Sequence, residues 1–108
     1  MKPSVSSAFQ AFVEQAPEES KAWMQMVETL SAGTDLDRKT RSLCYLSVLA
    51  AARLTTGIPF HASQARVLGA TREEVVGAVL VGLPAVGNVV IESLPAALAA
   101  FDTTREPG

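Results

Sequence analysis

The stretch DRKTRSLCYLSVLAAARL, residues 37–54, decides the fold of this chain. Asp37 is a typical N-cap residue, because its carboxylate can accept hydrogen bonds from the first free N–H groups of a helix. Charged residues follow it, and from Leu43 to Ala52 the sequence is mostly apolar. An apolar surface on nearly all sides is typical of a helix that is buried on several sides. The stretch therefore predicts a central helix that ends at the turn-like residues 55–57.

Helix start and stop signals recur on both sides of this stretch, whereas strand signals are weak. Pro17 and Pro59 suit the first turn of a helix, Gly33 and Gly69 suit its end, and Thr71 begins the capping-box pattern TREE. The chain is therefore predicted to be all-α, with about six helices that span 6–15, 17–33, 37–54, 59–69, 73–83 and 89–101. The tail 102–108 is predicted to be frayed.

Length and composition indicate one domain that associates with copies of itself. The chain has 108 residues, of which 48% are hydrophobic and 19% are charged. A monomer of this size leaves much of its apolar surface in water, so we expect part of that surface to be buried between subunits. On the helix 17–33, Trp23, Met26, Val27 and Leu30 share one face, which we interpret as core.

The net charge, the single cysteine and the N-terminal sequence indicate which partners and which cellular compartment to expect. The net charge is −2 and no lysine or arginine cluster is present, so nucleic acid is not expected as a partner. The first ten residues lack the pattern of a signal peptide, and the single cysteine, Cys44, excludes an intrachain disulfide. We therefore expect a cytoplasmic protein. Glycines and a proline interrupt the uncharged run between Glu74 and Glu92, so no membrane span is expected.

The candidate site residues are one histidine, two arginines and two hydroxyl groups. His61 is the only histidine, and a side chain that titrates near neutral pH suits a general acid or base. Arg53 and Arg66 suit a carboxylate anchor, and Ser42 and Tyr45 suit substrate hydrogen bonds. The alternatives are a helix-start histidine bonded to backbone, solvated or ion-paired arginines, and a tyrosine that packs in the core. A lone histidine cannot build a metal site, and no cofactor is expected.

Three pieces of the sequence carry a family resemblance: LDRKTRSL (36–43), His61 followed by GATREEV (69–75), and LPAALAAF (94–101). In order and spacing they resemble the carboxymuconolactone decarboxylase / AhpD-like superfamily. Residues 36–101 would form the family core, and 1–35 the N-terminal helices, of a single domain 1–108. The resemblance implies an all-α fold around a central helical hairpin and obligate homo-oligomers, trimers or hexamers. Arg41, within the first piece, is interpreted as structural.

The thiol peroxidase branch of this superfamily uses a C-x-x-C-x-x-x-H motif and a relay glutamate. If His61 is the motif histidine, the cysteine positions fall on Leu54 and Gly57, and the relay position falls on Ser42. Only the histidine of these four groups is present, so the resemblance favours the decarboxylase branch, whose substrate is a carboxylated muconolactone. Cys44 is interpreted as a packing residue, because burial in apolar surroundings makes a thiol poorly reactive.

The leading hypothesis is a lyase of the decarboxylase-like branch that acts on a small carboxylated lactone or a related acid. His61 would move the proton, and Arg53 or Arg66 would hold the carboxylate. We expect a mainly apolar pocket between the helix 37–54 and the helix 59–69. Proton transfer usually needs two groups with separated pKa values, so the second group is expected from another subunit or from Glu73, Glu74 or Glu92.

Two other functions stay open on the sequence alone. The first is an AhpD-like alkylhydroperoxidase, which would depend on oxidation of Cys44 and is disfavoured by the missing cysteine pair. The second is a non-catalytic oligomeric binding or scaffold protein, in which His61 would have no chemical role. The three hypotheses differ in whether the imidazole or the thiol occupies a reactive environment.

Overall fold

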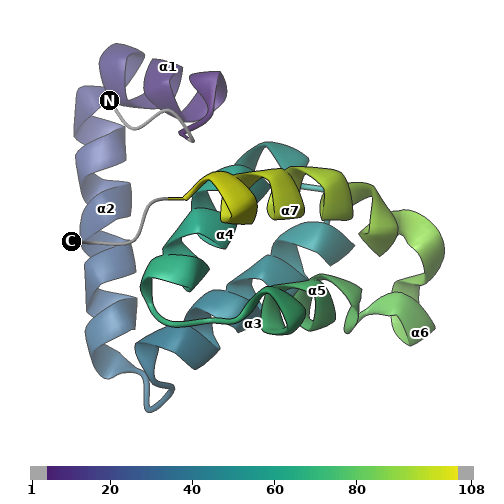
Figure 1. The fold of residues 1–108 in the computed structure, drawn as a ribbon. Coiled ribbons are helices and arrows are strands. Elements are labelled where there is room, and N and C mark those ends of the chain that lie inside the picture. The colour runs from purple at the N-terminus through teal and green to yellow at the C-terminus, as the bar shows by residue number, and fades with distance from the viewer. Residues whose placement is uncertain (1–4, 105–108) are drawn as a thin grey trace.

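The computed structural model describes residues 5–104 of the chain. These residues fold into helices joined by short turns, with no strand among them, as the sequence predicts (Figure 1). Seven elements are α-helices and two are 3₁₀-helices. In chain order they are α1 (Ser7–Gln15), α2 (Pro17–Gly33), α3 (Arg38–Ala51), η1 (Thr55–Gly57), α4 (Ile58–Val67), α5 (Arg72–Leu80), α6 (Leu83–Val86), η2 (Gly87–Ser93) and α7 (Leu94–Thr103).

The core lies where α3, α4, α5 and α7 meet. α3 contacts both α4 and α5, and α7 packs along α4 and also contacts α5 (Figure 1). The largest fully buried apolar side chains are Leu46 on α3, Ile58 on α4, Val75 and Val79 on α5, and Val90 on η2. Much of the remaining core is alanine, whose small side chain allows helix axes to approach closely.

The helix starts that the sequence predicts around this core are confirmed. The Asp37 carboxylate accepts a hydrogen bond from the Thr40 backbone N–H at 2.8 Å, and this bond lowers the pKa of Asp37. Thr71 and Glu74 form both halves of a capping box. The Glu74 N–H donates to the Thr71 hydroxyl at 3.0 Å, and the Thr71 N–H donates to the Glu74 carboxylate at 2.9 Å. Each cap satisfies N–H groups that a helix start leaves without a partner.

The last two helices expected from the sequence, 73–83 and 89–101, are each divided in the structure. Pro84 and Pro95 each lie in the first turn of a new helix, where a missing N–H costs no hydrogen bond. Gly87 ends α6 with φ of 80° and ψ of −159°, a backbone conformation that is nearly restricted to glycine. The expected boundaries were therefore wrong because these residues redirect the chain.

The C-terminal third of the chain is long and apolar enough to cross a bilayer when only length and composition are considered. Within Arg72–Thr103, one 18-residue window has a mean hydropathy of 2.0, and 17% of that window is buried. The structure divides this run into α5, α6, η2 and α7, which fold back on α3 and α4. The run is therefore not a single straight helix.

Helix α2 departs from the expectation that its apolar face is core. It packs mainly against α1, stands apart from the other helices (Figure 1), and has only Ser20 buried. Trp23 is 37% exposed, Met26 49% and Leu30 61%. The Trp23 ring contacts Phe9 of α1 at 5.4 Å between centroids, so the aromatic contacts hold α1 on α2 rather than α2 on the core. The spacing of apolar residues correctly identified the apolar face of α2, but it does not show what covers that face.

The outward side of α3 corrects two further expectations. Tyr45 does not pack in the core, because 42% of it is exposed, and Val48 on the same helix is 60% exposed. Cys44 is also exposed, so the expected burial of its thiol is wrong. α4, α5 and η2 pack against α3, whereas α2 diverges from α3 at its N-terminal end (Figure 1).

Replacing Gly87 and Gly77 with alanine should change the stability of the fold in opposite directions. Gly87→Ala should destabilise the fold by about 1–3 kcal/mol, because alanine is strained at this positive φ. Gly77 lies inside α5, where an added methyl group would meet no atom within 4 Å, so Gly77→Ala should stabilise by about 0.5–1 kcal/mol. Urea unfolding of both variants measures these changes. Equal effects of the two substitutions would contradict the assigned backbone at Gly87.

Candidate functional site

His61 lies in the first half of α4 and is partly buried against aromatic rings. Its ring centroid is 4.4 Å from that of Tyr45, which projects from α3, with an angle of 36° between the planes. Phe60 contacts the imidazole edge-on at 5.1 Å. The packing of α3 on α4 therefore brings together two of the predicted site residues, His61 and Tyr45.

Burial lowers the pKa of His61 below its usual value of 6.5. Desolvation causes the shift, because removing water disfavours the charged imidazolium. Among residues 5–104, no charged group shifts this pKa and no hydrogen bond engages the imidazole. The alternative of a helix-start histidine bonded to backbone is therefore not what this part of the chain shows. The lowered pKa favours the neutral imidazole, which can act as a base.

The positions that correspond to the thiol motif lie close to this histidine but carry no sulfur. A side chain at Gly57 would place its Cβ 4.0 Å from His61 Cδ2 and 3.4 Å from a methyl of Leu49. Leu54, at the other motif position, is 54% exposed just before η1. A Cβ at this position would make ordinary van der Waals contacts with both side chains, and the glycine places no polar group beside the imidazole. The imidazole environment is apolar as a result.

Ser42, the third predicted site residue on this side, lies on α3 three residues before Tyr45. Its Oγ is buried and has no hydrogen-bond partner within residues 5–104. A buried hydroxyl without a partner costs stability, typically about 1–3 kcal/mol. Ser42 therefore retains an unused donor and acceptor on the helix that also carries Tyr45.

The two predicted arginines are not brought to the imidazole. Arg66 donates a hydrogen bond to the Phe101 carbonyl, and its guanidinium lies 4.8 Å from the centre of the Phe101 ring. It follows His61 by five residues, which is about 140° round the helix at 3.6 residues per turn. Arg53 is exposed, just past the end of α3, with φ of 61°. Arg66 therefore joins α4 to α7, and Arg53 faces solvent.

The acidic residues expected as the second proton-transfer group are also engaged or remote. Glu74 pairs with Lys39 at 3.2 Å, and its pKa is lowered by the Thr71 backbone N–H and by Lys39. Glu73 and Glu92 are exposed. No cluster of three histidine, cysteine or acidic residues suited to a metal ion lies within the described part of the chain.

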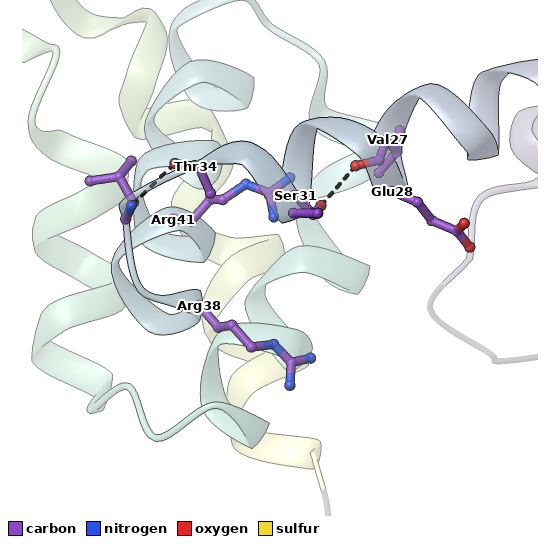
Figure 2. Close-up of a pocket in the computed structure, with 8 residues that line it drawn as sticks. Val27, Glu28, Ser31, Thr34, Arg38 and Arg41 are labelled. Carbon is purple, nitrogen blue, oxygen red and sulfur yellow. Dashed lines mark hydrogen bonds between the residues drawn. The ribbon is translucent and has the colours of Figure 1, made fainter.

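Sequence reasoning missed a groove at the elbow between the end of α2 and the start of α3. It has a volume of about 430 Å³. Figure 2 shows the Arg41 side chain extending toward Ser31 across this elbow. Its polar lining comes from both helices and the turn between them, namely Glu28, Ser31, Thr34, Arg38 and Arg41. The sequence signal for the groove is the pair of arginines in LDRKTRSL, of which Arg41 is predicted to have a structural role.

The lowered pKa of His61 makes the stability of the fold depend on pH. Because the folded state holds His61 at a pKa below 6.5, it binds fewer protons than the unfolded chain. The neutral imidazole therefore stabilises the folded state fully above pH 6.5, and this stabilisation is lost as the pH falls through the folded pKa of His61. An NMR titration of His61 should give a midpoint below 6.5.

Urea unfolding at pH 7 and pH 5 should show a smaller loss of stability in His61→Gln than in the native chain. The carboxylates with lowered pKa lose their contributions below their usual values of 3.8 and 4.5, outside this window. A His61 midpoint at or above 6.5 would contradict the burial of the ring.

Comparisons with known proteins identify the family of this fold. The Carboxymuconolactone decarboxylase family model matches residues 17–105, which is most of the chain. The crystal structure of an apo carboxymuconolactone decarboxylase family protein from Legionella pneumophila has a TM-score of 0.74 and 24% identity, covering 89% of this chain and 86% of that chain. At this identity the likeness shows the fold. Comparison with curated proteins finds no significant relative. The chain belongs to the carboxymuconolactone decarboxylase family.

Proposed function

We propose that this chain is a decarboxylase-like lyase that acts on a small carboxylated lactone or a related acid, with His61 moving the proton. The observation that carries the proposal is the state of His61 itself. Its imidazole is partly desolvated between Tyr45 and Phe60, and no charged group of residues 5–104 engages it. A histidine held only by ring contacts keeps both nitrogens available for chemistry.

The proposed decarboxylation consumes one proton. In the decarboxylation, the bond between the ring carbon and the carboxylate carbon breaks and carbon dioxide leaves. The electron pair stays on the ring carbon, where conjugation with the lactone carbonyl stabilises it, and that carbon takes up a proton. An anionic substrate beside the imidazole favours its protonated form, because opposite charges attract. A ring that is neutral in the empty site therefore becomes the proton donor when the acid binds.

The direct test is turnover of a carboxylated muconolactone and related carboxylated five-membered lactones, followed by carbon dioxide release. His61→Ala should lower kcat by roughly 100-fold or more, the usual contribution of a positioned acid or base. Added imidazole should restore part of the rate. Cys44→Ser is the matched control and should leave the rate unchanged, because Cys44 lies on the exposed side of α3. Equal turnover in His61→Ala and the native chain, for every accepted substrate, would end the proposal.

We also propose that copies of this chain associate through α2 and the outward side of α3, as a trimer or hexamer. The support is the apolar surface that these two helices leave in water. Trp23, Met26 and Leu30 on α2, together with Val48 on α3, are all more than a third exposed. Within residues 5–104, α2 packs mainly against α1, so another chain that packs on its apolar face would bury it. A homo-oligomer supplies that cover at both helices at once.

Light scattering on the purified chain tests this association. The native chain should have the mass of a trimer or hexamer, and Leu30→Glu should shift it toward the monomer, because a buried unpaired carboxylate is costly. Thr29→Glu places the same charge on the neighbouring exposed position of α2 and should leave the mass unchanged. A monomeric native chain at micromolar concentration would refute the proposal.

A further inference from the structure

We propose that the elbow groove between α2 and α3 binds an anionic group of the substrate through Arg38 and Arg41, which act as its carboxylate anchor. The inference rests on the proposed function and deepens it, because it names the residues that hold the acid. It also replaces Arg53 and Arg66 in that role. Arg66 is occupied by Phe101, and Arg53 is exposed beyond the end of α3.

The charges of the first turn of α3 support this assignment. Three cations follow Asp37, namely Arg38, Lys39 and Arg41. Lys39 pairs with Glu74 at 3.2 Å, whereas neither arginine pairs with a carboxylate of residues 5–104. The groove contains one carboxylate, Glu28, so its lining carries a net positive charge. A guanidinium presents a planar pair of donors that matches the two oxygens of a carboxylate.

The other groove residues suit a small organic acid rather than a bare inorganic ion. The Thr34 hydroxyl accepts the Leu36 backbone N–H at 3.1 Å, so its own hydrogen remains free to donate. The Ser31 hydroxyl donates to the Val27 carbonyl at 2.8 Å, and its lone pairs remain free. Val27 and Leu36 supply apolar wall beside these polar groups. A volume of about 430 Å³ lies within the range of small-molecule sites.

The register of α3 places the two groove arginines on the same helix face as Tyr45, whose ring contacts His61. Arg38, Arg41 and Tyr45 are spaced by three and four residues, so they share one face of the helix. At a rise of about 1.5 Å per residue, Arg41 precedes Tyr45 by about 6 Å along the axis. Helical side chains lean toward the N-terminus, so the Tyr45 ring leans toward Arg41. The same ring contacts the imidazole at 4.4 Å.

The experiment uses the full native chain with ¹⁵N label and the probe 5-oxotetrahydrofuran-2-carboxylate, a five-membered lactone with one carboxylate. NMR follows the Nε–Hε signals of the arginines during titration. Arg38 and Arg41 should show saturable shifts that weaken at high salt, as expected for a partly exposed ion pair. The uncharged methyl ester of the probe is the matched ligand control and should shift neither signal.

Variants then assign the binding to particular residues. Arg38→Gln and Arg41→Gln should each weaken probe binding roughly tenfold, the usual effect of losing one charge-assisted hydrogen bond. Lys21→Gln removes a cation from the exposed surface of α2 and should leave binding unchanged. Arg53→Gln tests the anchor that the sequence suggested. Weakening by Arg53→Gln but not by Arg41→Gln would overturn the inference.

Two readouts separate this inference from the proposed function. His61→Ala should keep probe binding and lose turnover, so failure of turnover in the native chain counts against the function alone. Absence of saturable shifts at Arg38 and Arg41 in the native chain, up to millimolar probe, overturns the anchor whatever the variants do. Because that measurement needs no substitution, a variant that fails to fold does not leave the anchor undecided.

Discussion

The packing of α3 on α4 is the contact on which the rest of this structure depends. Leu46, Leu49 and Ala50 from α3 share one buried cluster with Ile58, Ala62 and Ala65 from α4. Small residues at this contact allow the two helices to approach closely. Beside this cluster, the same contact brings the Tyr45 ring onto the His61 ring. A change that separated these helices would therefore dismantle the core and the candidate site together.

The same packing accounts for the chemical state of the imidazole. Desolvation lowers the pKa of His61, and the surroundings that desolvate it are rings and aliphatic groups. Gly57 places no side chain beside the ring at the position where the thiol branch would carry a cysteine. An apolar environment without a fixed counter-charge suits a proton carrier whose pKa rises when an anion arrives. The lack of sulfur at the motif positions and the lack of a charged partner for the imidazole thus result from the same local packing.

Local sequence signals were reliable where the interaction itself is local. The Asp37 cap and the Thr71–Glu74 capping box each depend on residues three apart, and both are confirmed. The all-α class follows from the same kind of signal. The burial of Cys44 and of the α2 face was wrong, because periodicity identifies an apolar side of a helix but not its cover. The glycines between Glu74 and Glu92 were expected to interrupt that run, but the sequence pattern does not give the positive φ with which Gly87 redirects the chain.

The groove could not be derived from sequence, because its two walls come from helices whose relative angle is a tertiary property. That angle also connects the groove to the exposed apolar face of α2. Val27 and Ser31 line the groove, while Met26 and Leu30 on the same helix remain in water. A second copy that packs on α2 would hold this helix at one angle to α3 and so set the width of the groove. By linkage, a ligand that prefers that width stabilises the assembly, and the assembly strengthens ligand binding by the same factor.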